Sequence, residues 1–103
     1  MPKRTRSYEE DLTKRLRDPK YAAGYLDAVL LDSANEGKER FLLALRDVAK
    51  AHGMTKLAQE TDMAREAMYR ALSENGNPEL ATLTSLLDAV GLRLSVGVKR
   101  KAS

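Results

Sequence analysis

Apolar residues recur at three- and four-residue steps along most of this chain, and this spacing predicts α-helices. The period is sharpest in MTKLAQETDMAREAMYRAL, residues 54–72, where it predicts two short helices joined by a tight turn. Four other segments show the same period. We therefore expect helices at about residues 8–17, 19–32, 38–52, 56–61, 64–73 and 80–90.

Residues typical of helix ends support these boundaries. Ser7, which acidic residues follow, and Asp18, which Pro19 follows, are expected to cap the first two helices. Thr55 is expected to cap the fourth helix in the same way. Gly24, inside the second helix, lowers helix stability by about 1 kcal/mol relative to Ala. Either another helix approaches closely at this glycine, or its presence is accidental.

The two short helices at 54–72 have the outline of a helix-turn-helix. We expect the apolar face of the second helix to be buried, and it consists of Ala64, Ala67, Met68, Ala71 and Leu72. The opposite face carries hydrogen-bonding side chains, which are Arg65, Glu66, Tyr69, Arg70 and Ser73. A helix with such a polar face fits the major groove of B-form DNA. This segment therefore indicates DNA binding.

The period changes to two near the end of the chain. The alternating apolar residues are Leu92, Leu94, Val96 and Val98. This alternation predicts a β-strand, and no other segment predicts one. We therefore expect the backbone partner of the strand in a second copy of the chain, which gives a homodimer. An extended tail lying on the chain's own helices is the alternative.

Together these elements predict an all-α fold. It is a small bundle of about five to six helices with a helix-turn-helix and a single C-terminal β-strand paired across a dimer. We expect one compact domain, in which residues 1–37 form an N-terminal helical segment, 38–91 the helix-turn-helix core, and 92–103 the strand and a basic tail. The length of 103 residues and the hydrophobic content of 43% suit one domain with a modest core.

The composition argues against several classes of function. The chain has no Cys and a single His, His52, so it has no disulfide, and we expect no metal site. Its carboxylates do not combine with a nucleophile and a base, and we expect neither enzymatic activity nor a cofactor. Acidic residues at 9–11 interrupt any signal sequence, and no apolar run reaches the roughly 20 residues that span a bilayer. We therefore expect a soluble, cytoplasmic protein.

Residues 41–90 resemble the phage-repressor (XRE or Cro) class of helix-turn-helix domains. Ala58 stands where that class has a small residue between the two helices, and Met68 where it has an aliphatic side chain. Asp62 replaces the usual Gly of the turn, and Asp adopts the left-handed conformation more readily than most residues. The resemblance implies four base-reading residues, which are Arg65, Glu66, Tyr69 and Arg70. Alternatively, Glu66 and Arg70 form only an exposed helical ion pair.

Contacts to the DNA backbone are expected on both sides of the second helix. Thr55, Lys56 and Gln59 lie at or near the start of the first helix, where free amides and the helix dipole favour a phosphate. The candidates on the other side are Ser73, Asn75 and Asn77, although loop residues need no such role. The net charge of +3, with basic residues at both chain ends, is compatible with a polyanionic partner or with solubility alone.

A wider resemblance covers nearly the whole chain. The segments DLTKRLRDPKYAAGYLDAVL, FLLALRDVAKAHGMTKLAQETDMAREAMYRALSENGNPELATL and LLDAVGLRLSV resemble addiction-module antidote proteins, the HigA-like antitoxins. The resemblance implies a protein that binds and neutralises a RelE- or HigB-like ribonuclease toxin and represses its own operon. A stand-alone phage-type regulator without a toxin partner is the alternative, and an adaptor that has lost DNA binding is a third.

The N-terminal segment has no expected role in reading DNA. The resemblance suggests that it binds the toxin through its apolar side chains, which are Tyr8, Leu12, Leu16, Tyr21, Tyr25 and Leu26. The alternative is that these side chains complete the chain's own core. The spacing does not distinguish the two, because a small bundle needs an apolar surface of this kind to be buried in either case.

Overall fold

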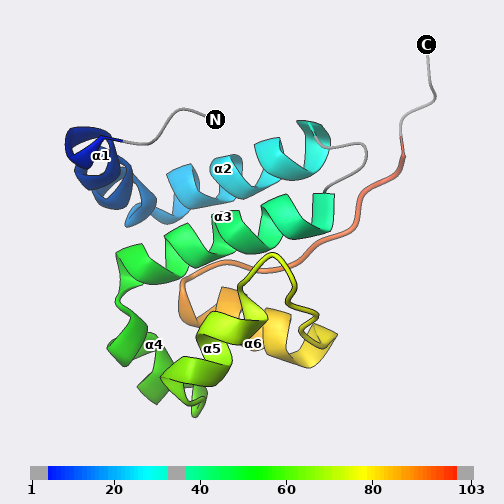
Figure 1. The fold of residues 1–103 in the computed structure, drawn as a ribbon. Helices are drawn as coiled ribbons and strands as arrows, with labels where there is room; N and C mark the ends of the chain where they lie inside the picture. Colours follow the sequence, from blue (N-terminus) through cyan, green and yellow to red (C-terminus); the bar gives the residue numbers. More distant parts are fainter. Residues whose placement is uncertain (1–4, 33–36, 100–103) are drawn as a thin grey trace.

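The computed structural model describes residues 5–32 and 37–99, which contain six helices (Figure 1). These are α1 (Arg6–Leu16), α2 (Pro19–Asp32), α3 (Gly37–His52), α4 (Met54–Thr61), α5 (Arg65–Ala71) and α6 (Leu80–Ala89). The fold is all-α, as the helical period predicts, and each helix lies within a few residues of its predicted bounds. None of the helices in these ranges is long and apolar enough to cross a bilayer.

α3 is the central helix of the bundle. It contacts α1, α2 and α4, and Figure 1 shows it between α2 and the group formed by α4, α5 and α6. Its buried residues are Leu42, Ala44, Leu45, Val48, Ala49 and Ala51. Burial of a leucine side chain contributes roughly 1.5–3 kcal/mol. α3 therefore joins the N-terminal helices to the helix-turn-helix through one hydrophobic core.

The starts of the first two helices differ in how well they were predicted. Thr5, not Ser7, caps α1, because the backbone N–H of Tyr8 donates to Thr5 Oγ1 at 3.1 Å. Ser7 lies inside the helix. Asp18 caps α2 as predicted, since the backbone N–H of Lys20 donates to its Oδ1 at 3.0 Å. A hydroxyl three residues before a free amide suffices for a cap, and the acidic run at 9–11 follows both Thr5 and Ser7 within a few residues.

The turn between α4 and α5 confirms the role predicted for Asp62. This residue adopts the left-handed conformation, with φ 56° and ψ 36°. The backbone N–H of Met63 donates to the carbonyl of Ala58 at 3.1 Å, which is the six-to-one hydrogen bond that ends many helices. The cap predicted at Thr55 is wrong, because α4 begins at Met54, two residues before the predicted start, and Gly53 with φ 110° precedes it.

The strand predicted at 92–98 is wrong, and with it the dimer sheet. Residues 92–99 are extended, but the described part of the chain contains no strand. Leu92 is half-buried against the core, and its backbone N–H donates to the carbonyl of Leu87 at 2.8 Å. Leu94 is 44% exposed, while Val96 and Val98 are 100% and 98% exposed. Within this segment only Leu92 packs against the chain's core, so the alternation does not correspond to a strand with one buried face.

Two glycines show opposite local environments. A Cβ at Gly76 would lie 2.2 Å from the carbonyl oxygen of Ala71 and 2.9 Å from that of Arg70, so the loop after α5 packs directly against the helix end. At Gly24 no heavy atom lies within 4 Å of an added Cβ. Close helix packing therefore does not explain Gly24.

Gly76→Ala is expected to lower the free energy of unfolding by about 1–3 kcal/mol, because the backbone atoms that a methyl group would meet cannot move without displacing α5. Gly24→Ala is the matched control, and it is expected to raise the free energy of unfolding by about 0.5–1 kcal/mol, since Ala loses less entropy in a helix. Urea denaturation followed by circular dichroism measures both changes. Equal stability of Gly76→Ala and the unmodified chain would contradict the close approach.

Candidate functional site

α4 and α5 form a helix-turn-helix that is anchored by three side chains. Leu57 of α4, Met68 of α5 and Leu72 directly after α5 are all 0% exposed. Ala58 is half-buried against the same core, at the position predicted to need a small residue. α4 contacts α3, α5 and α6. On the inner face of α5, Met68 is completely buried, while Ala67 and Ala71 are half-buried.

Three of the four predicted base-reading residues lie on this outer face. Arg65, Glu66 and Arg70 are exposed. Among the described residues, no ion pair joins Glu66 to Arg70, so the alternative of a helical pair is not what the structure contains. Ala64 was predicted to be buried but is exposed, because it precedes the helix in an extended conformation, with φ −70° and ψ 144°. Both arginines are thus available to a ligand.

Tyr69, the fourth predicted reader, has a different environment. It is half-buried against the core, and the guanidinium of Arg46 from α3 lies 5.5 Å from the centre of its ring. This is a cation–π distance. The Nε atom of Arg46 is buried and has no hydrogen-bond partner among the described residues. The ring of Tyr69 therefore fills the space between α5 and α3.

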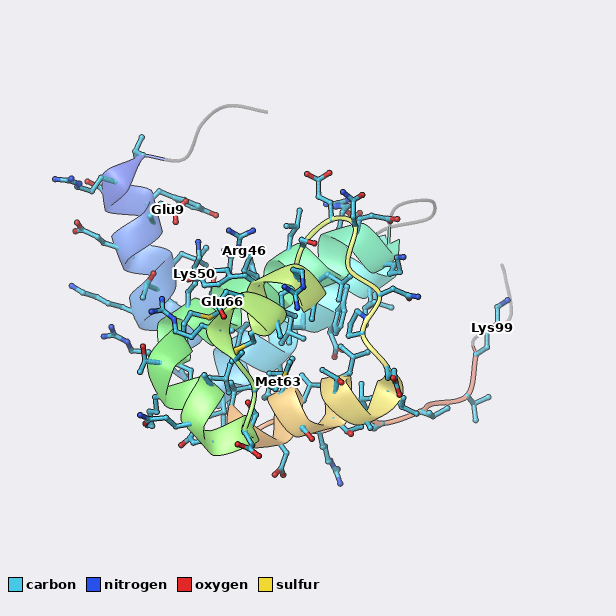
Figure 2. All side chains as sticks on the ribbon, turned by 60° about the horizontal axis from the view of Figure 1, so that its bottom comes forward. Glu9, Arg46, Lys50, Met63, Glu66 and Lys99 are labelled. Carbon is cyan, nitrogen blue, oxygen red and sulfur yellow. The ribbon has the colours of Figure 1, made fainter. Side chains whose placement is uncertain are left out.

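Arg46 was not among the predicted site residues. Figure 2 shows Arg46 and Lys50, both on α3, at the side of the bundle where α5 carries Glu66. The two basic residues stand four positions apart on one helix, and this spacing was visible in the sequence. The sequence did not show that the face of α3 with these two residues lies on the same side of the bundle as α5.

The predicted phosphate-contacting residues lie on both flanks of α5. Thr55, Lys56 and Gln59 are exposed on α4, and Lys56 also lines a small surface depression with His52 at the end of α3. Ser73 is half-buried, and its hydroxyl donates to the carbonyl of Arg70 at 2.8 Å, so it closes the end of α5. The exposed loop residues on that flank are Asn75 and Asn77.

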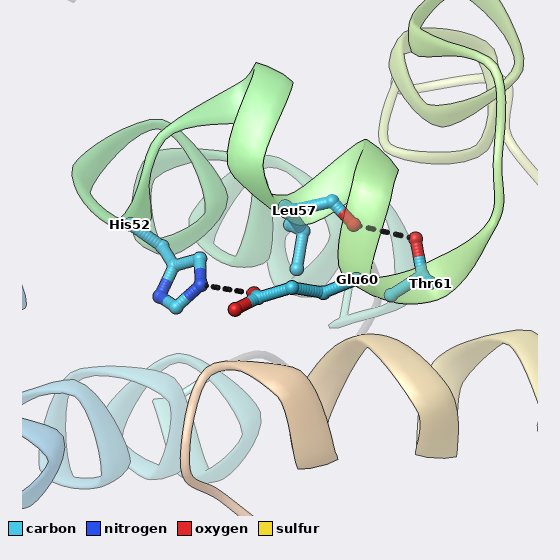
Figure 3. A network of polar contacts seen from close by, with 4 residues as sticks. All are labelled: His52, Leu57, Glu60 and Thr61. Carbon is cyan, nitrogen blue, oxygen red and sulfur yellow. Dashed lines mark hydrogen bonds and ion pairs between the residues drawn. The ribbon is translucent and has the colours of Figure 1, made fainter.

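A polar network fixes the end of α3 to α4 (Figure 3). His52 Nε2 lies 2.6 Å from Glu60 Oε1, and the Thr61 hydroxyl donates to the carbonyl of Leu57 at 2.7 Å. The carboxylate of Glu60 is thereby turned towards α3 and engaged with the imidazole. The His52–Glu60 contact joins α3 to α4, whereas the Thr61–Leu57 hydrogen bond lies within α4.

Acidic side chains outnumber basic ones in and around α5. Residues 54–79 contain three basic side chains, Lys56, Arg65 and Arg70. The same stretch contains five acidic ones, Glu60, Asp62, Glu66, Glu74 and Glu79. The helix-turn-helix is therefore not a broad basic patch, and binding of an anion there depends on the individual arginines and on Arg46 and Lys50 beside them.

The candidate toxin-binding residues do not share one surface. Leu12, Leu16 and Leu26 are buried in the chain's own core, at 6%, 3% and 5% exposure. Tyr25 is half-buried, and its hydroxyl donates to Asp47 Oδ2 at 2.8 Å. Tyr8 and Tyr21 are 51% and 39% exposed, and the guanidinium of Arg15 lies 5.9 Å from the ring centre of Tyr21.

A family model and one curated relative match nearly the whole chain. The family model described as probable addiction module antidote protein matches residues 6–98. An uncharacterized protein of Haemophilus influenzae is 33% identical over 92 residues, which cover 89% of this chain and 92% of that protein. No solved structure matches the chain. With nearly its whole length matched, the chain belongs to the family of probable addiction module antidote proteins.

Proposed function

We propose that this chain is a HigA-like antitoxin, which neutralises a RelE- or HigB-like ribonuclease toxin by direct binding and represses its own operon by binding DNA through α5. An antidote implies a toxin as its partner. DNA binding is supported by the helix-turn-helix, in which buried Met68 and Leu72 anchor the helix that carries exposed Arg65 and Arg70. No catalytic step belongs to this role.

In this proposal Arg65 and Arg70 read bases in the major groove. An arginine side chain donates two hydrogen bonds to guanine O6 and N7, and each such contact discriminates by about 1–3 kcal/mol. Glu66 accepts a hydrogen bond from the amino group of a cytosine. Tyr69 packs against the guanidinium of Arg46 and so keeps α5 in position for these contacts. Lys56, with Thr55 and Gln59, contacts the phosphates that flank the groove.

Repression further implies two copies of the chain on a pseudo-palindromic operator. Their reading helices would enter successive major grooves about 34 Å apart, one turn of the duplex. The two copies are not joined through a shared sheet, because the C-terminal segment is not a strand. The mass of the chain in solution, measured with and without operator DNA, tests the pairing.

Replacement of Arg65 or Arg70 with Ala is expected to reduce discrimination between the operator and scrambled DNA by about 10- to 100-fold, because a bidentate base contact is lost. The measurement is a titration of the DNA upstream of this gene at several salt concentrations. Arg40→Ala is the matched control, since Arg40 lies on α3 with its guanidinium 3.8 Å from Asp32 and outside the helix-turn-helix. Unchanged discrimination in both Arg65→Ala and Arg70→Ala would overturn base reading by α5.

Replacement of Lys56 with Ala is expected to weaken binding to all sequences similarly. The slope of log K against log salt concentration should fall by about 0.9, the value for one phosphate contact. The same titrations with operator and scrambled DNA measure this change. A loss confined to the operator would instead assign Lys56 to base reading.

The proposed binding of the toxin is tested with the protein that the reading frame beside this gene encodes. Co-expression of the antitoxin is expected to restore growth that this product arrests, and the two purified proteins are expected to form a complex by analytical ultracentrifugation. Arg65→Ala should restore growth as well as the unmodified chain does, because α5 is not needed to bind the toxin. Operator binding without any effect on the neighbouring product would favour a stand-alone regulator.

A further inference from the structure

A hollow in the surface lies away from the helix-turn-helix. It is an open groove of about 590 Å³ between α2, α6 and the extended segment after α6. Its apolar lining consists of Leu26, Leu30, Phe41, Leu87, Leu92 and Leu94. No residue of α4 or α5 lines it. A molecule bound in this groove would therefore leave the reading helix accessible.

The groove is bordered by apolar side chains that the chain itself does not cover. Leu30 and Leu94 line it and are 50% and 44% exposed. Leu31, which follows Leu30 on α2, is 87% exposed, and Val96 and Val98 continue the extended segment almost fully exposed. Leu30 and Leu94 thus leave apolar surface uncovered in one groove, which is typical of a protein-binding surface, whereas isolated exposed leucines are ordinary.

The polar lining of the groove favours a cationic partner. Asp27 and Asp88 both line it, and neither forms an ion pair or side-chain hydrogen bond with another described residue. Arg93 is the one basic side chain in the lining. The two carboxylates thus outnumber the single guanidinium, so the groove presents an apolar floor beside a surplus of negative charge.

We propose that this groove is the docking surface for the toxin, which inserts an apolar side chain beside basic residues that meet Asp27 and Asp88. This inference rests on the proposed function. A ribonuclease binds a polyanion and therefore presents basic side chains. The carboxylates of the groove complement such a surface, and their contact with it would also cover positive charge that the toxin needs for RNA.

A second copy of this chain fits the groove less well. A twofold contact uses the same patch on both subunits, so the carboxylates of one copy would face those of the other. Like charges brought together at an interface oppose association. One arginine in each copy, Arg93, does not balance two carboxylates. The negative charge of the groove thus favours a positively charged partner over a second copy of this chain.

Leu30→Glu and Leu94→Glu are expected to weaken binding of the purified neighbouring gene product by at least about tenfold, because each places a charge on the apolar floor. Both leucines are about half exposed, so the variants should keep the helical circular dichroism of the unmodified chain. Leu80→Glu is the matched control. Leu80 is 67% exposed at the start of α6 and lies outside the groove, and its variant should bind as tightly as the unmodified chain.

Asp27→Asn combined with Asp88→Asn keeps the shape of the groove and removes its charge. This variant is expected to bind more weakly, and its binding should depend less on salt than that of the unmodified chain. Isothermal titration calorimetry at two salt concentrations measures both effects. An unchanged salt dependence would overturn the assigned role of the two carboxylates.

The remaining outcomes separate this inference from the proposed function. If the unmodified chain binds the neighbouring gene product and the leucine variants bind it equally well, the groove is wrong while the antitoxin role stands. If the unmodified chain does not bind the neighbouring gene product, both the docking groove and the antitoxin role are wrong. If the leucine variants instead halve the mass of the free chain and leave toxin binding unchanged, the groove is a contact between copies and the inference is overturned.

Discussion

Burial of the inner face of α5 is the constraint on which the site depends. α5 has only seven residues, and isolated helices shorter than about 12–15 residues are marginal in water. Its conformation therefore comes from packing, through Met68 and Leu72 with Leu57 beneath the turn. Because α3 carries both this assembly and the N-terminal helices, the orientation of the reading face is determined by the core of the whole bundle.

Several features encoded in neighbouring residues could be predicted from the sequence, although the caps expected at Ser7 and Thr55 were wrong. The helical period depends on residues three or four apart, and the left-handed turn at Asp62 depends on one residue. Features that depend on distant segments could not. The spacing on α5 did not reveal that Arg46 of α3 lies over Tyr69, and the alternation at 92–98 indicated an extended backbone without revealing that no strand pairs with it. The burial of Leu12 and Leu16 likewise depends on α3, far along the chain.

α6 connects the two surfaces proposed to bind DNA and toxin. It contacts α4 on one side and lines the groove through Leu87 and Asp88 on the other. A close-packed helix transmits small displacements because its neighbours leave few voids. On the proposed function, a toxin bound in the groove would thus be separated from the helix-turn-helix by the width of one helix. This distance is short enough for each ligand to influence the binding of the other.

The acidic balance of residues 54–79 has a consequence for how such a protein would find its operator. Affinity for arbitrary DNA comes mainly from neutralised phosphates, and a genome offers about 10⁶–10⁹ competing sites. On the proposed function, five carboxylates beside three cations would keep that background affinity low. A repressor with this balance of charge binds few non-specific sites. A small number of copies per cell therefore leaves enough free repressor to bind a single promoter.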